Sequence, residues 1–401
     1  MKSAEMNKVT FLKSTLLLSS LFSTLCYASF FDPVDEQFDM GHHLAENAVG
    51  FLPVPIIITE PAVGYGGGLV GVFMHETDEQ KEERKQAALN STDGGAQLVP
   101  GAITVLGAAG TENGSWFAFV GHRHSWLKDT IRYTGGVGVG QMNLNIYKDL
   151  SLDASGERFP SIDRSFEFST ETRGFALQQA LQFRVANTPL MLGIKQFASY
   201  TDLSSDNAYI EQLMAFTLGK EQITSGLGLT ADYDTRNNLF YPTKGYQFAA
   251  QYMVYDDKVG SDQEYQKLDV DGQVYVPLAQ KWTLSFAGNY QYFNTEERFL
   301  SPTTQPYIKL RGVSSYRYQG DEIATVQTQI VYDIDDRWNV SGFYGYGRAK
   351  EKTSLSDDQA VGAYGAGFRY QIARRYGLRI GMDLARSDNE SAFYISLGSG
   401  F

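Results

Sequence analysis

Apolar and polar residues alternate along several segments in the C-terminal third of the chain. In residues 282–292 one face is apolar and aromatic, and it comprises Trp282, Leu284, Phe286, Tyr290 and Tyr292. The opposite face of that segment is mostly polar, and the same alternation recurs in 338–347, 364–372 and 378–385. Because successive side chains of a strand point to opposite sides, this period of two predicts β-strands with one apolar and one polar face.

The polar faces and the composition decide between a soluble β-sandwich and a membrane barrel. The polar faces carry Arg369, Arg379 and Asp383, and such charges need water or partners. The chain has 40 Gly, 25 Tyr and 25 Phe but only 11 Pro, and aromatic residues gather near the ends of the expected strands. Outer-membrane barrels have apolar outward faces between two girdles of aromatic residues. The sequence therefore predicts an all-β fold, a transmembrane antiparallel β-barrel.

The connections between the expected strands alternate in length. Short connections lie at 186–188, 277–281, 333–337 and 373–376, and longer ones at 148–164, 204–223, 295–320 and 348–359. Outer-membrane barrels have short turns on the periplasmic side and longer loops outside. Two connections fit less well, because 387–390 is a short outside loop and 234–244 is a long inside turn.

The alternation yields fifteen strands from residue 64 onward. They are 64–76, 98–109, 115–125, 129–147, 165–185, 189–202, 224–234, 244–256, 263–276, 281–293, 322–333, 337–348, 360–372, 376–386 and 391–401. Single-chain bacterial barrels have an even number, and segment 51–60 supplies a sixteenth strand. Its Pro53 and Pro55 restrict it to a strand start or a seam edge. We expect sixteen strands, with fourteen as the alternative. The charged stretch 77–96 is expected to be a solvated loop rather than a short helix.

The N-terminus has the features of an export signal. Three lysines lie in the first 13 residues, and an apolar run of signal-peptide length covers 11–25. Small residues then predict cleavage between Ala28 and Ser29. The sequence thus predicts a signal peptide at 1–28, a polar segment at 29–50 and a barrel at 51–401. The polar segment either forms a short amphipathic element at the periplasmic mouth or in the lumen, or serves as a flexible leader.

Cleavage would also change the chemistry of the chain. It removes Cys26, the single cysteine, so the mature chain has no thiol in an oxidising periplasm. It removes three Lys and one Glu, so the formal net charge changes from −12 to −14. This excess of negative charge argues against nucleic acid as a partner.

Three segments are more specific than the composition. The first is a strand and polar turn at 226–238, followed by the Tyr-Pro-Thr-Lys-Gly of 241–245. The second is the Lys-Leu-Arg-Gly-Val of 309–313 in the longest loop. The third is the terminal strand, whose alternating apolar residues include Phe393, Ile395, Leu397 and the final Phe401. Together they resemble the barrel of the BamA/TamA superfamily, of the bacterial surface antigen type, over 224–401 and more loosely over 51–70.

The resemblance implies a role for particular residues. In that superfamily a long loop carries an Arg-Gly motif and folds into the lumen, where the Arg meets acidic or aromatic groups of the wall. Arg311 and Gly312 match this motif, and the loop would then act as a luminal latch. The residues that match the family's C-terminal assembly signal are Phe393, Ile395, Leu397 and Phe401. The resident assembly machinery recognises such a signal by pairing it, as an added strand, with an open sheet edge.

The chain departs from the family pattern in three places. Val313 follows the Arg-Gly motif where an aromatic residue is usual, and Gly345 stands where Asp is common. The periplasmic repeat domains of the family translocases are absent from this sequence, so it resembles the barrel-only members. Arg311 therefore needs another acceptor. The luminal candidates by strand parity are Asp232, Asp269, Asp271 and Asp383.

The resemblance also implies a location and a function. The expected location is the outer membrane of a Gram-negative-type bacterium, and the expected role is outer-membrane biogenesis or translocation of a protein or lipid. The expected partners are outer-membrane lipid and lipopolysaccharide, the assembly machinery during insertion, and a client or solute. The alternative is a passive diffusion pore in which Arg369, Arg379 and Asp383 set the selectivity.

Features of enzymes are weak in this sequence. His122 and His124 share one strand face, but no nearby cysteine or carboxylate cluster completes a metal site. The sequence has no G-x-S-x-G motif. The glycine-rich stretch 135–140 lies on an expected strand without a following helix, so it does not predict a phosphate site. We therefore expect no catalysis, no cofactor and no metal.

Overall fold

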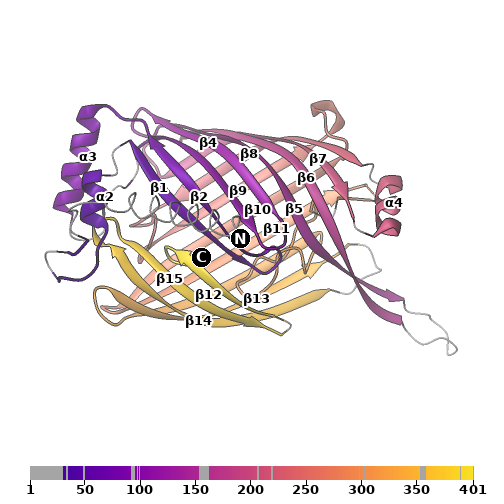
Figure 1. The fold of residues 1–401 in the computed structure, drawn as a ribbon. Helices are drawn as coiled ribbons and strands as arrows, with labels where there is room; N and C mark the ends of the chain where they lie inside the picture. The colour runs from indigo at the N-terminus through magenta and orange to yellow at the C-terminus, as the bar shows by residue number, and fades with distance from the viewer. Residues whose placement is uncertain are drawn as a thin grey trace, which may run out of the picture.

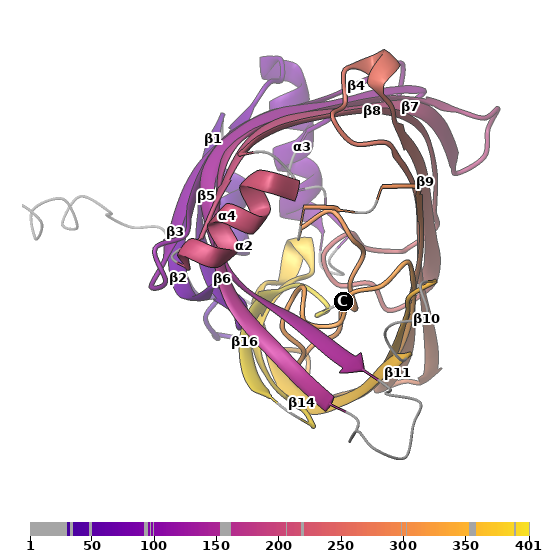
Figure 2. The same ribbon diagram turned by 90° about the vertical axis from the view of Figure 1, so that its right-hand side faces the viewer.

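The protein folds as one antiparallel sheet of sixteen strands that curls into a nearly closed barrel (Figures 1 and 2). The computed structural model describes residues 30–32, 35–47, 50–91, 95–96, 98, 100–152, 162–205, 207–217, 220–297, 299–301, 303–352, 358–388 and 390–400. Each strand pairs with its neighbour in the sequence, from β1 to β16. The predicted barrel of sixteen strands is confirmed, and the alternative of fourteen is excluded.

The strand bounds follow the predicted alternation closely. They are β1 (Phe51–Glu60), β2 (Gly64–Met74), β3 (Ala102–Thr111), β4 (Trp116–Trp126), β5 (Ile131–Leu152), β6 (Ile162–Arg184), β7 (Leu190–Ser204), β8 (Glu221–Asp234), β9 (Gly245–Tyr255), β10 (Tyr265–Ala279), β11 (Trp282–Thr295), β12 (Glu322–Asp333), β13 (Trp338–Lys350), β14 (Gln359–Ala373), β15 (Leu378–Ser387) and β16 (Ser391–Leu397). On β13 the side chains of Val340, Tyr344 and Tyr346 are exposed on the outside. Asn339 and Ser341, on either side of Val340, are buried, so the period of two separates an apolar wall from a polar lumen.

The two ends of the barrel differ. Most connections at one end are short turns, and this is the periplasmic end by the rule for outer-membrane barrels. The other end carries the long loops and helix α4 (Ala208–Thr217). Strands β5 and β6 have 22 and 23 residues, so their hairpin extends beyond the rest of the barrel at that end (Figure 1). Within the described residues, no helix has the length and apolarity needed to cross a membrane.

The prediction of a solvated loop at 77–96 is wrong, because helix α3 (Asp78–Asn90) forms there. Thr77 caps the helix: its hydroxyl accepts from the amide of Gln80, and the Gln80 side chain accepts from the Thr77 amide. The helix packs against α2 (Gly41–Asn47) and the turn η2 (Arg374–Tyr376), where Ala88 and Tyr376 are fully buried. The residues of the capping box, Thr77 and Gln80, are present in the sequence. The many charged residues of this stretch had instead indicated a loop.

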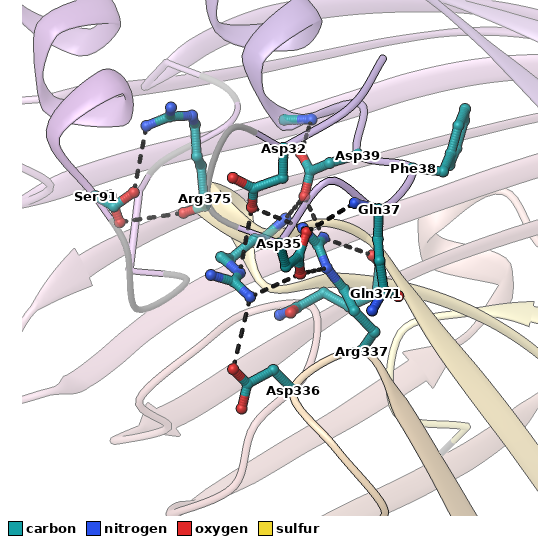
Figure 3. A network of polar contacts seen from close by, with 12 residues as sticks. Asp32, Asp35, Gln37, Phe38, Asp39, Ser91, Asp336, Arg337, Gln371 and Arg375 are labelled. Atoms are coloured by element: carbon teal, nitrogen blue, oxygen red, sulfur yellow. Dashed lines mark hydrogen bonds and ion pairs between the residues drawn. The ribbon is translucent and has the colours of Figure 1, made fainter. Parts of the chain in front are cut away.

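The described part of the N-terminal segment is attached to the periplasmic turns (Figure 3). Asp32, Asp35 and Asp39 surround Arg337, whose side chain is only 1% exposed. Arg337 Nη2 lies 2.6 Å from Asp32 Oδ2, its Nε lies 2.6 Å from Asp35 Oδ2, and its Nη1 donates to Asp39. Arg374 also donates to Asp35, over 3.0 Å. We call this set of three aspartates and two arginines the N-terminal clamp.

The N-terminal clamp should release in acid. The hydrogen bond from Arg337 holds the pKa of Asp35 below its ordinary value. A carboxyl with a lowered folded pKa contributes its stability above its unfolded pKa and loses it as the pH falls through the folded pKa. Amide hydrogen exchange in 35–47 should therefore stay protected from pH 7 down to about pH 4 and lose protection below that, near the reference value for Asp. The strand amides of β13 serve as the internal control, and release of the segment between pH 7 and 5 would contradict this assignment.

The terminal strand is shorter than the predicted 391–401, because β16 ends at Leu397. Gly398 and Gly400 have φ values of +102° and +92°, which take the chain out of the sheet. Arg369 Nε donates to Gly398 O over 3.0 Å, and Gln329 Nε2 donates to Ser399 O over 3.2 Å. The chain end thus lies within the ring of strands (Figure 2). The predicted signal peptide (residues 1–28) with its cleavage site between Ala28 and Ser29, and the final Phe401, lie outside the described residues.

Candidate functional site: a luminal loop beside the barrel seam

The long connection between β11 and β12, residues 296–321, folds into the barrel. The loop closes on itself, because the amide of Ile308 donates to Tyr318 O and the amide of Gly320 donates to Pro306 O. Its apolar residues pack with luminal side chains of β12, β13 and β14 in one cluster, which comprises Ile308, Leu310, Val313, Ile323, Ala349, Val361 and Ala363. Burial of these apolar side chains holds the loop against the inner wall.

Two glycines of β13 make room for the loop. A Cβ on Gly345 would lie 2.9 Å from Leu310 Cδ2, and a Cβ on Gly347 would lie 2.6 Å from Ile308 Cγ2. Gly345 is the position where the family pattern has Asp. An Asp side chain would not fit at this position, because Leu310 occupies the space that it would need.

Arg311 lies between an acidic group and an aromatic ring. Its Nη1 donates to Asp383 Oδ2 on β15 over 3.1 Å. Its guanidinium carbon lies 3.6 Å from the centre of the Phe343 ring, which is close enough for a cation–π contact. Arg369 on β14 binds the same carboxylate through two hydrogen bonds of 2.8 and 2.7 Å. Asp383 is 1% exposed, so two guanidinium groups balance one buried carboxylate.

The other three candidate acceptors have different neighbours. Asp269 faces the loop residue Lys309, with 3.7 Å between Lys309 Nζ and Asp269 Oδ2. Asn289 Nδ2 donates to both Asp269 and Asp271, over 2.7 and 2.9 Å. Asp232 on β8 lies 3.5 Å from Gln247 Nε2. Of the four aspartates, the structure brings Asp383 to Arg311.

Gly312 approaches the last two strands closely. Its φ is +91°, and a Cβ there would lie 3.1 Å from Ala385 Cβ and 3.2 Å from the amide nitrogen of Arg386. Its amide donates to the hydroxyl of Tyr394 on β16 over 2.9 Å. A side chain at this position would therefore push the loop away from the wall. Phe393, Ile395 and Leu397 alternate with Tyr394 along β16 and so point outward.

The tip of the loop contacts both strands that border the seam. The seam lies between β1 and β16, which share no backbone ladder within the described residues. The amide of Ser315 donates to Glu60 at the end of β1 over 3.0 Å. The amide of Ser314 and the Arg317 Nη1 donate to Glu390, which directly precedes β16, over 2.8 and 2.6 Å. Sequence reasoning did not identify Glu60, Glu390 or Phe343, because no local pattern marks the partners of a loop.

The three residues that would set the selectivity of a passive pore all contact other protein groups inside the barrel. They are Arg369, Arg379 and Asp383. Arg369 and Asp383 bind one another, as described above. Arg379 donates to Arg337 O over 3.0 Å and lies 4.7 Å from the ring centre of Tyr241. Tyr241 belongs to the periplasmic turn between β8 and β9, and burial raises the pKa of Tyr241 to about 12.

The histidines of β4 make structural contacts. His122 Nδ1 and Thr104 Oγ1 are 2.9 Å apart, and the ring of His124 stacks on Trp126 at 4.2 Å between centres. In the part of the chain that the structure describes, the one cluster with metal-ligand spacing is Asp256, Asp257 and Glu264, and two of its three members are exposed. It contains no histidine.

Comparison with solved structures supports the fold. BamA from Haemophilus ducreyi, lacking POTRA domains 1–3, matches with a TM-score of 0.58 and 11% identity over 87% of this chain and 70% of that one. CdiB from Acinetobacter baumannii matches with a TM-score of 0.54 and 12% identity over 88% and 59%. CdiB from Escherichia coli matches with a TM-score of 0.51 and 8% identity over 86% and 61%. The chain therefore spans less than two thirds of either CdiB chain.

Comparison at the level of sequence families is more specific. No curated protein matches the sequence significantly. The model of the Omp85 superfamily domain matches residues 141–401, which include the luminal loop, Asp383 and the terminal strand. The chain belongs to the Omp85 superfamily of outer-membrane β-barrels.

Proposed function

We propose that this protein acts in outer-membrane biogenesis or in translocation of a protein or lipid, without catalysis, and that the loop 296–321 is its latch. The observation that carries the proposal is the set of loop contacts described above. One segment binds the wall through Arg311 and Asp383 and also binds both seam strands through Glu60 and Glu390. A segment with these contacts would couple the lumen to the seam.

The chemistry of the contacts suits a latch that can be released. Arg311 is bound to the wall by an ion pair and a ring face, while Ile308, Leu310 and Val313 bind by apolar burial. Release would exchange these contacts for equivalent ones with a client. Export with a signal peptide cleaved between Ala28 and Ser29 is part of the same proposal, as are contacts with lipid, lipopolysaccharide and the assembly machinery.

The proposal predicts that Arg311→Ala changes conductance in planar bilayers. Wild-type protein, refolded without residues 1–28, should give low and fluctuating conductance, because the loop occupies the lumen. Arg311→Ala should give larger or longer openings, since it removes the ion pair to Asp383. The matched control is Arg348→Ala, because Arg348 pairs with Asp358 in an exposed position.

A passive pore predicts a different result. Large, steady conductance that is equal in wild type, Arg311→Ala and Arg348→Ala would contradict the latch and support free diffusion of small solutes. The internal pairing of Arg369, Arg379 and Asp383 favours the latch, because these charges contact protein groups.

A further inference from the structure

The luminal face of strands β1 to β4 is apolar, although the interior of outer-membrane barrels is usually polar. Tyr394 of β16 faces the luminal loop, while its neighbour Phe393 contacts Tyr65 on the outside, so the odd-numbered residues of β2 face outward. The antiparallel registers extend this assignment to the neighbouring strands. The large apolar side chains that face the lumen are Val54, Ile56, Ile58, Val70, Val72, Val105, Phe117 and Phe119. We call this set the apolar luminal wall.

The apolar luminal wall is accessible from the lumen. Phe117 is 40% exposed, and Val70 and Val105 are half-buried. Helices α2 and α3 pack beside the periplasmic end of the wall, at Leu52 and Ile103, and the luminal loop packs on β12, β13 and β14 instead. Neither of the two apolar clusters among the described residues includes a member of the wall. An apolar surface of this kind favours a partner that removes it from water.

Three arginines lie at the periplasmic end of this wall. Arg123 is near the end of β4 and faces the lumen, since it shares the parity of the wall residues of that strand. Arg132 and Arg184 also face the lumen, and both pair with Asp129. Asp232 of β8 faces the same cluster, so three guanidinium groups are balanced by two carboxylates. Arg123 has no hydrogen bond or ion pair among the described residues, so its guanidinium is available to an anion.

The wall and the arginines have the dimensions and the chemistry of a lipid. Arg123 follows Phe117 by six positions on β4. At about 3.3 Å per residue and a tilt near 40°, these positions span about 15 Å, half of a hydrocarbon core of about 30 Å. An extended polypeptide would bring backbone N–H and C=O groups that the side chains of the wall cannot satisfy. An acyl chain has no such groups, and a lipid phosphate is a suitable partner for a guanidinium.

We propose that the lumen of this barrel binds a lipid with an anionic headgroup. The acyl chain lies along the apolar luminal wall, and the headgroup phosphate binds Arg123 at the periplasmic end. This inference rests on the proposed function and deepens it, because it selects a lipid rather than a protein as the translocated client.

Photo-crosslinking tests the proposal. Phosphatidylglycerol with a diazirine in one acyl chain is added to the protein, refolded without residues 1–28 in detergent micelles, and mass spectrometry identifies the labelled positions. Strands β3 and β4 supply an internal control, because Leu106 and Val120 face outward while Val105 and Phe119 face the lumen. We expect phosphatidylglycerol to label both faces. Phosphatidylcholine with the same chain should label the outward face alone, since its headgroup has no net charge.

Two variants separate the headgroup contact from the apolar contact. Arg123→Gln should lower luminal labelling by phosphatidylglycerol roughly tenfold or more, the effect of losing a hydrogen bond to a charged group, and should leave outward labelling unchanged. Its matched control is Arg348→Gln, on an exposed pair of β13. Phe119→Gln should also lower luminal labelling, whereas Phe197→Gln, which alters a luminal ring of β7 outside the wall, should not. The comparison of the two headgroups on unaltered protein decides the question even where a variant fails to fold.

The proposal is overturned if phosphatidylglycerol labels only the outward residues, or if both headgroups label the lumen equally. Conductance separates this failure from failure of the proposed function. Absence of luminal labelling, together with conductance that responds to Arg311→Ala, would leave a latch for a client of another class and would overturn the lipid site. Luminal labelling that depends on Arg123, together with conductance that ignores Arg311→Ala, would establish the lipid site in a barrel without a latch.

Discussion

Asp383→Asn should destabilise the barrel by about 3–5 kcal/mol, the usual cost of removing one partner from a buried ion pair. Asp383 is 1% exposed and balances the guanidinium groups of both Arg311 and Arg369. The amide keeps the shape of the side chain but not its charge, so two buried cations lose their counter-charge. Urea unfolding of the refolded protein in lipid vesicles measures the change.

The control for this variant is Asp358→Asn. Asp358 pairs with Arg348, and their side chains are 36% and 58% exposed, so the change should be below about 1 kcal/mol. Replacing Arg311 and Arg369 with Met and Asp383 with Leu should recover much of the lost stability, since apolar groups of similar volume can replace a buried ionic triad. Equal stability of Asp383→Asn and Asp358→Asn would show that the triad is hydrated.

Arg337→Met should release the N-terminal segment from the barrel. Arg337 is 1% exposed and holds three carboxylates, so its loss leaves Asp32, Asp35 and Asp39 close together without their main counter-charge. Loss of such a buried partner costs about 3–5 kcal/mol, which corresponds to at least a roughly 100-fold faster exchange of protected amides in 35–47. Hydrogen exchange read by mass spectrometry measures this directly.

The strands themselves should survive Arg337→Met, because their ladders do not include the segment. Amide protection in β12 and β13 is therefore the internal reference. Arg348→Met, on an exposed pair of β13, is the matched control and should leave 35–47 protected. Protection of 35–47 that persists in Arg337→Met would mean that apolar packing of Leu44 and Ala45 against α3 is sufficient.

The strands could be predicted from the sequence because a barrel wall has two chemically different sides. Strand β13 was identified within two residues at each end, since every second side chain meets a different environment. The end of β16 could not be predicted in this way. Leu397 and Phe401 continue the alternation, while the turn at Gly398 depends on contacts with distant residues such as Arg379 and Phe240.

The candidate site was predictable only in part. The Arg-Gly motif marked the loop, and strand parity reduced the acceptors of Arg311 to four aspartates that parity alone could not separate. The choice of Asp383 depends on where the loop crosses the lumen, which Leu310 and Gly345 decide by packing. Glu60 and Glu390 are 330 positions apart in the sequence, and only closure of the barrel brings them to one loop.

The length of the β5–β6 hairpin determines which part of this protein is most accessible from outside the cell. At about 3.3 Å per residue and a tilt near 40°, 22 residues rise about 55 Å, roughly twice the height of the apolar band of such a barrel. Its outer half therefore extends beyond the apolar band and lies in water. Large soluble molecules outside the cell would contact this hairpin before they reach the barrel wall, which lies within the lipid.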